Sequence, residues 1–163
     1  MLKKKRYSLA LIGDAKVGKT EIIKLLDKNA ESRGTTYQID TGRISYTIWE
    51  LQTMSSEPER LGVFATSFLD QTSSYNRFVI IVTDSTREDV NKIVYSIKFL
   101  RRTFPNTRLA VIANKQDLEN RLPGKQIEKM TKLPTLHLSA IDRTHRQRLL
   151  NFISYLIETD TGL

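Results

Sequence analysis

The chain has 163 residues, no cysteine, 39% hydrophobic and 27% charged residues, and a formal net charge of +8. This composition is typical of an ordinary soluble globular chain, and it excludes disulfide scaffolds, thiolate metal sites and cysteine nucleophiles. We expect a single domain over residues 1–163, working in the cytoplasm because a cysteine-free chain suits a reducing compartment.

The excess of positive charge gathers at residues 3–6, 101–102 and 143–148. Such clusters permit a nucleic acid or the head groups of a membrane as partner. No aromatic side chains are interleaved with them as a stacking platform would require, which favours solvated helix faces and tails. Contact with nucleic acid is therefore not indicated, and contact with a membrane is expected to be peripheral at most.

The first predicted strand is an apolar run over residues 7–12, and the helical pattern of residues 21–28 follows it closely. Between them stands the sequence GDAKVGKT, which fits the pattern G-x-x-x-x-G-K-[ST]. Strand, glycine loop and helix in this order are typical of a phosphate-binding loop rather than of an ordinary glycine turn. The loop comprises Gly13, Asp14, Ala15, Lys16, Val17, Gly18, Lys19 and Thr20.

Each residue type in this loop suits a polyphosphate. Glycines let the backbone N–H groups turn toward phosphate oxygens, and the helix N-terminus adds its positive end. Lys19 is expected to reach the β- and γ-phosphates, and Thr20 to give a hydroxyl to Mg²⁺. We include the next residue, Glu21, in the predicted binding set.

Further along, residues 37–39 and the alternating run 43–49 flank the turn signal Asp-Thr-Gly and predict an antiparallel edge pair. Apolar runs at residues 78–82 and 109–113 predict buried parallel strands, separated by a helix over residues 90–104. A short strand follows Pro134, and a last helix is expected over residues 142–158. The sequence thus predicts an α/β three-layer sandwich, with a six-stranded, mostly parallel sheet, one antiparallel edge strand and about five helices.

A second motif, Asn114-Lys115-Gln116-Asp117, follows a predicted strand directly. A carboxylate at that position can accept from both N1–H and the amino group of guanine, a pair of donors that adenine lacks. Lys115 can lie along the base, and Asn114 can tie this loop to the phosphate loop. After the last strand, backbone N–H groups of Ser139 and Ala140 are placed to donate to guanine O6, and we include Ile141 with them.

With these motifs in order, the chain resembles a small GTPase of the Ras and Arf superfamily over essentially its whole length. The resemblance implies GTP and GDP binding with Mg²⁺, and two switch segments that respond to the γ-phosphate. It also implies regulatory proteins and an effector that bind through residues 30–76. The second switch falls on residues 55–76, where Leu61, Phe64, Phe68 and Leu69 form an apolar stripe.

The switches depart from the family pattern. The family's D-x-x-G element, which reaches Mg²⁺ through water, corresponds here to Glu50-Leu51-Gln52-Thr53, so Glu50 keeps the carboxylate on a longer side chain. Met54 stands where many members have the glutamine that orients the attacking water, so hydrolysis is expected to be slow. Gln52 and Gln71 are the candidate substitutes.

Two further questions stay open at this stage. Either Thr35 or Thr36 is the candidate for the switch threonine that ligates Mg²⁺ in the family, and a simple turn threonine is the alternative. The sequence favours a slow GTPase, then a GTP-binding scaffold without hydrolysis, and last a P-loop nucleotide kinase.

Overall fold

The computed structural model describes residues 3–52, 58–72 and 76–159. Its strands are β1 (Lys5–Gly13), β2 (Ser32–Arg33), β3 (Thr36–Asp40), β4 (Ile44–Gln52), β5 (Arg77–Thr83), β6 (Arg108–Ala113) and β7 (Thr135–His137). Its helices are α1 (Lys19–Leu26), α2 (Pro58–Gln71), α3 (Arg87–Thr103), α4 (Gly124–Thr131) and α5 (Arg146–Glu158), with a 3-10 turn, η2 (Arg143–His145), before α5.

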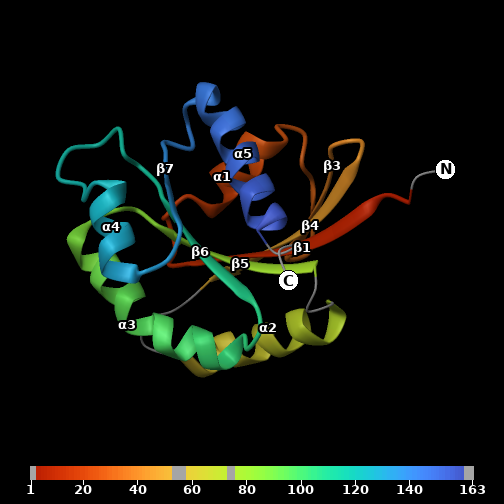
Figure 1. Ribbon diagram of the computed structural model, residues 1–163, viewed down its shortest axis with the longest axis horizontal. Coiled ribbons are helices and arrows are strands. Elements are labelled where there is room, and N and C mark those ends of the chain that lie inside the picture. The colour runs from red at the N-terminus through yellow and green to blue at the C-terminus, as the bar shows by residue number, and fades with distance from the viewer. Residues whose placement is uncertain (1–2, 53–57, 73–75, 160–163) are drawn as a thin grey trace.

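The strands form one sheet in the order β2-β3-β4-β1-β5-β6-β7. Strand pairs from β4 through β1, β5 and β6 to β7 are parallel, whereas β3 is antiparallel to both β2 and β4. Because the connections between parallel strands carry helices, the sheet is covered on both faces (Figure 1).

The predicted fold class is confirmed, with seven strands in place of six. The additional strand, β2, pairs with the start of β3 through a tight hairpin around Gly34, whose φ of 70° is in the left-handed region. A two-residue strand has too few side chains to show the alternation by which strands are recognised, so β2 could not be predicted from the sequence. The expected antiparallel pair of residues 37–39 and 43–49 is present as β3 and β4.

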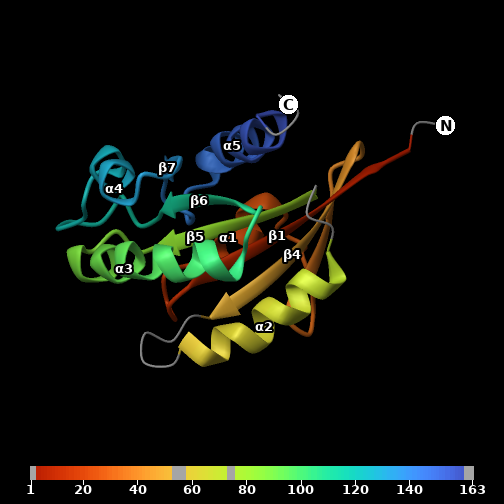
Figure 2. The same ribbon diagram turned by 60° about the horizontal axis from the view of Figure 1, so that its bottom comes forward.

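Two apolar layers hold the helices to the sheet. On one face, α1 and α5 pack on alternate residues of the central strands, such as Leu9, Leu11 and Ile80. On the other face, α2, α3 and α4 pack on the intervening residues, such as Ala10 and Ile81. Figure 2 shows the two helix layers on opposite sides of the sheet. The near-continuous apolar runs in the sequence follow from this burial on both faces.

The carboxyl ends of the parallel strands meet at one edge of the sheet, where open α/β sheets bind ligands. β1 ends there at Gly13, β5 at Thr83 and β6 at Ala113, so the predicted phosphate and base-reading loops leave the same end of the sheet, on either side of β5. No helix in the described part of the chain is long and apolar enough to cross a membrane.

Candidate functional site

The phosphate loop leaves β1 at Gly13 and enters α1 at Lys19. A Cβ on Gly13 would lie 2.5 Å from the Val82 carbonyl oxygen of the neighbouring strand, so only glycine fits there. Gly18 precedes α1 with φ 101°, and Lys16 also has a positive φ, of 65°. These conformations curl the loop back over the helix N-terminus, as a phosphate cradle requires.

Lys19 folds inside this loop. Its Nζ donates to the carbonyl oxygens of Gly13 at 2.7 Å and of Asp14 at 2.8 Å, and the side chain is 6% exposed. Burial lowers the pKa of Lys19, while the nearby carboxylates of Glu50, Asp14 and Asp89 oppose that shift. The two carbonyls use two of the three donors of an ammonium group, so the charge is held in place beside the loop.

Thr20 begins the helix beside Lys19, and its hydroxyl donates to Glu50 Oε1 at 2.7 Å. The other oxygen of that carboxylate, Oε2, accepts from the Tyr37 hydroxyl at 3.2 Å. Burial first, and then the Glu50 carboxylate, raise the pKa of Tyr37, so this phenol stays protonated and donates at neutral pH. A chain of hydroxyl, carboxylate and phenol thus joins α1, β4 and β3.

Asn114 connects the two predicted loops. Its Nδ2 donates to the Val17 carbonyl at 2.9 Å, and its Oδ1 accepts from the backbone N–H of Ala140 at 2.9 Å. The tie that the sequence predicted between Asn114 and the phosphate loop is therefore present. Since Asn114 is 2% exposed, both bonds lie out of water and strongly constrain the loops.

The side chains around Asp117 are also held. Ser139 Oγ donates to Asp117 Oδ1 at 2.6 Å. This bond orients the carboxylate of the exposed Asp117 through one of its two oxygens. Lys115 Nζ donates to the Lys16 carbonyl at 2.6 Å, so a second contact joins the base-reading and phosphate loops. A cavity of about 410 Å³ lies against Asp117, Ser139 and the 73% exposed Ile141.

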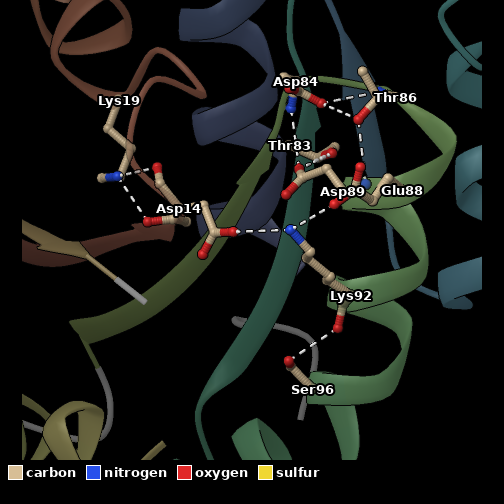
Figure 3. A network of polar contacts seen from close by, with 10 residues as sticks. Asp14, Lys19, Thr83, Asp84, Thr86, Glu88, Asp89, Lys92 and Ser96 are labelled. Atoms are coloured by element: carbon tan, nitrogen blue, oxygen red, sulfur yellow. Dashed lines mark hydrogen bonds and ion pairs between the residues drawn. The ribbon is translucent and has the colours of Figure 1, made fainter. Parts of the chain in front are cut away.

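The connection from β5 to α3 carries a network of polar contacts beside the phosphate loop (Figure 3). Buried Asp89 accepts from Thr83 Oγ1 at 2.5 Å and from the Asp84 N–H at 3.2 Å, and its burial raises its pKa. Lys92, one turn further along α3, lies 3.8 Å from an Asp14 carboxylate oxygen in the phosphate loop. Ser85 Oγ donates to the Asn114 carbonyl at 2.6 Å. This cluster therefore links α3 to both loops.

Some predicted residues are not brought to Lys19. Thr36 pairs with Trp49, whose ring packs under α2, so Thr36 lies on the sheet face opposite Glu50, and its hydroxyl donates to the Arg33 carbonyl. Thr35 is exposed in the hairpin turn, and its carbonyl accepts from the Glu50 N–H at 3.0 Å.

The two glutamines differ in place. Gln52 pairs with Gly13 at the end of β4, next to the phosphate loop. Gln71 is the last residue of α2 and precedes the start of β5, so it lies at the end of the sheet away from the phosphate loop. Its side chain donates to Ser67. We therefore keep Gln52 and not Gln71 in the candidate site. Thr53 and Met54 lie outside the described residues, as do the side chains of Leu61 and Phe64, whereas Phe68 of the predicted stripe is buried.

No group of three or more His, Asp or Glu that could hold a metal occurs among the described residues. A metal at this site would therefore need phosphate oxygens in addition to protein ligands, as Mg²⁺ commonly has. Thr20 and Glu50 offer adjacent hard oxygen atoms beside the phosphate loop, and this donor set fits Mg²⁺.

Sequence comparison finds no matching protein-family model and no matching curated protein. Solved structures do match. The FeoB G-domain from Methanococcus jannaschii has a TM-score of 0.71 at 18% identity, covering 94% of this chain and 99% of that chain. A mutation variant of SsGBP has a TM-score of 0.72 at 20% identity, covering 93% of this chain and 57% of that chain. The chain has the fold of a G domain.

These TM-scores show the fold, but identities of 18% and 20% show nothing beyond it. The resemblance to the Ras and Arf superfamily therefore stays a prediction. Within the fold, the sequence missed several residues that shape the site: Tyr37, Ser85, Asp89 and His145, whose Nδ1 lies 3.0 Å from the Ser139 backbone nitrogen. Asp89 and Ser85 follow a strand end, where polar side chains signal a site, but Tyr37 and His145 carry no such signal.

Proposed function

We propose that this chain binds GTP and GDP through residues 13–21, 114–117 and 139–141, and that it acts as a guanine-nucleotide switch. The third ammonium donor of Lys19 is assigned to the phosphates, and Asp117 to the two donors of the guanine edge. Ala140 N–H already donates to Asn114, so guanine O6 would share that donor or use the neighbouring N–H of Ile141.

One observation carries this proposal: Asn114 bonds both the phosphate loop and the loop after β7, at 2.9 Å each. The two loops are 97 and 26 residues from Asn114 in sequence, yet both are tied to one buried side chain. This arrangement sets the phosphate cradle at a fixed distance from the Asp117 carboxylate. A site built in this way suits a ligand with a polyphosphate at one end and a guanine at the other.

We further propose Thr20 and Glu50 as the residues that hold Mg²⁺ with the nucleotide. The ion would neutralise part of the phosphate charge. Thr20 donates its proton to Glu50, which leaves the lone pairs of its oxygen available to a cation. Lys19 folds inside the same loop, where its positive charge would stabilise the negative phosphate oxygens.

Hydrolysis of GTP is proposed to be slow. Gln52 lies beside Gly13 at the end of β4, but its side chain is exposed and no hydrogen bond to the described residues directs it toward the phosphates. A partner that supplies a polarising group, binding through residues 30–76, would accelerate the reaction. The second candidate function is a GTP-binding scaffold without hydrolysis, favoured by the contact of Glu50 with Tyr37 that the family pattern does not predict.

The test is single-turnover hydrolysis of GTP by the purified protein with Mg²⁺, with bound GTP and GDP followed by chromatography. We expect guanine nucleotide to be retained and converted slowly, and Lys19→Ala to lose both retention and conversion. Lys24→Ala is the matched control, because Lys24 is an exposed lysine of the same helix. Stable bound GTP would favour the scaffold, and the absence of any retained guanine nucleotide would refute the proposal.

A further inference from the structure

Both oxygens of the Glu50 carboxylate are bonded in this structure. Oε1 accepts from Thr20 at 2.7 Å, and Oε2 accepts from Tyr37 at 3.2 Å. The three side chains come from α1, β4 and β3, and they lie on the sheet face that α1 covers. The two hydrogen bonds therefore give the carboxylate a defined orientation.

The strand register explains why Tyr37 reaches Glu50. Tyr37 of β3 is paired with Ile48 of β4. Glu50 comes two residues after Ile48 in β4, so the two side chains lie on the same face of the sheet. A diagonal neighbour at this offset is within reach of an aromatic side chain. The half-buried Tyr37 ring packs against the core, so its hydroxyl is carried on a rigid and fixed support.

A glutamate needs such support more than an aspartate does. Its side chain has one more rotatable bond, so holding its carboxylate in one place costs more conformational entropy. A second hydrogen bond, from a group that is already immobile, reduces the number of positions that the carboxylate can take. Partners that orient a ligand in this way commonly tune the affinity of a metal site.

We propose that Tyr37 is a positioning residue, whose hydroxyl holds Glu50 against Thr20 and thereby sets the affinity for Mg²⁺ in the nucleotide complex. This inference rests on the proposed function. It gives a tyrosine of β3 an indirect role in the metal site, where the sequence analysis expected Thr35 or Thr36 as a direct ligand. Among the described residues, the Glu50 carboxylate accepts from Thr20 and Tyr37, while the Thr36 hydroxyl donates to the Arg33 carbonyl.

The experiment measures the dissociation rate of fluorescent N-methylanthraniloyl-GDP from the full chain over a series of Mg²⁺ concentrations and in EDTA. For Tyr37→Phe we expect the half-saturating Mg²⁺ concentration to rise by about tenfold. The rates in EDTA and at saturating Mg²⁺ should match those of the wild-type protein, because the ring and its packing are kept. Tyr46→Phe is the matched control, since Tyr46 is a buried tyrosine on the same face of β4.

The double variant of Tyr37 and Glu50 gives an independent check. In a Glu50→Ala background, Tyr37→Phe should cause no further change in the Mg²⁺ dependence, because the group that Tyr37 positions is gone. An additive effect of Tyr37→Phe in that background would overturn the inference. The comparison also stays informative if the single Tyr37→Phe variant proves less stable in thermal melts.

Other outcomes separate the two proposals. Identical Mg²⁺ profiles for Tyr37→Phe and wild type overturn the positioning role and leave the proposed function standing. A rate that rises equally in EDTA and in Mg²⁺ shows that Tyr37 acts on the fold alone, which also overturns the role. Wild-type protein that retains no N-methylanthraniloyl-GDP refutes the proposed function, and the inference with it.

Discussion

The candidate site has two parts that are built differently. The phosphate loop and the base-reading loops are joined by buried or short hydrogen bonds from Asn114, Lys115 and Ser139. The edge formed by β2, β3 and the end of β4 is joined to the phosphate loop side by the carboxylate of Glu50. The first part is held by several hydrogen bonds between loops, whereas the second depends on one ionisable side chain. We infer that the hydrogen-bonded loops recognise the nucleotide. The response to the nucleotide would then come from β2, β3 and the end of β4.

The largest effect is expected from Gly18→Ala, which disturbs the hydrogen bonds of Asn114 between the phosphate loop and the base-reading loops. A Cβ on Gly18 would lie 2.2 Å from Asn114 Nδ2, and φ is 101°. We expect the free energy of unfolding to fall by about 3 kcal/mol, from backbone strain and the disrupted Asn114 bonds. Urea denaturation and retention of guanine nucleotide are the measurements.

The control for this change is Gly42→Ala in the β3–β4 turn. Gly42 has a φ of 86°, but nothing lies within 4 Å of the added Cβ. Only the strain of a positive φ applies, so a loss of about 1 kcal/mol is expected, with nucleotide retained. Equal losses for both variants would mean that the close approach of Asn114 to Gly18 does not hold the loops together.

The next effect tests how the first part selects its base. Asp117→Asn replaces a carboxylate oxygen with an amide donor, which suits the 2-oxo group of xanthine in place of the 2-amino group of guanine. We expect affinity for GDP to fall by at least about a hundredfold and affinity for xanthosine diphosphate to rise. Competition against a fluorescent nucleotide measures both. Unchanged preference for GDP would remove Asp117 from the base-reading role.

A smaller effect is expected from the carboxylate of Asp89, at the start of α3. Burial raises the pKa of Asp89, so the folded state binds more protons than the unfolded state just above the ordinary pKa of aspartate. Stability should therefore decrease as pH rises from about 4 toward the raised pKa of Asp89. Asp89→Asn should remove this decrease and leave the protein as stable at neutral pH, or more stable by about 1 kcal/mol.

Urea denaturation of wild type and Asp89→Asn across this pH range tests the prediction. The amide oxygen of asparagine can still accept from Thr83 and from the Asp84 N–H. A loss of several kcal/mol at neutral pH would show that the charge of Asp89 is required. The first part would then depend on electrostatic attraction, to Lys92 or Lys19, more than on hydrogen bonds.

The smallest effect is expected at the edge. Because Thr36 lies on the face opposite Glu50, Thr36→Val should change the Mg²⁺ dependence of nucleotide dissociation by no more than about twofold. Thr20→Val is the comparison variant and should raise the Mg²⁺ requirement strongly. A large shift from Thr36→Val would show that the β2–β3 hairpin turns over when nucleotide binds, and would restore the threonine as a ligand.

The sequence predicted the parts of the site that lie next to one another in the chain. The phosphate loop and the Asn114 to Asp117 motif each follow an apolar strand, and the carboxyl ends of parallel strands share one edge. The position of α4 was not predicted, since it begins at Gly124 after Pro123 with no side-chain cap. Gly124 is nonetheless required there, because a Cβ would lie 2.5 Å from the Cβ of His137 in β7.

What the sequence by itself determined was the fold class and the two motifs, because strand burial and loop chemistry are local properties that periodicity and spacing reveal. Only the tertiary structure decided that Tyr37 bonds Glu50, that Thr36 lies on the opposite face, and that Gln71 is at the end of the sheet away from the phosphate loop. A one-residue change of register moves every side chain of a strand to the other face. That register is set by the β3–β4 turn at Gly42 and by the burial of Ile48 and Trp49 on opposite faces of β4, and the sequence analysis located the turn without fixing the register.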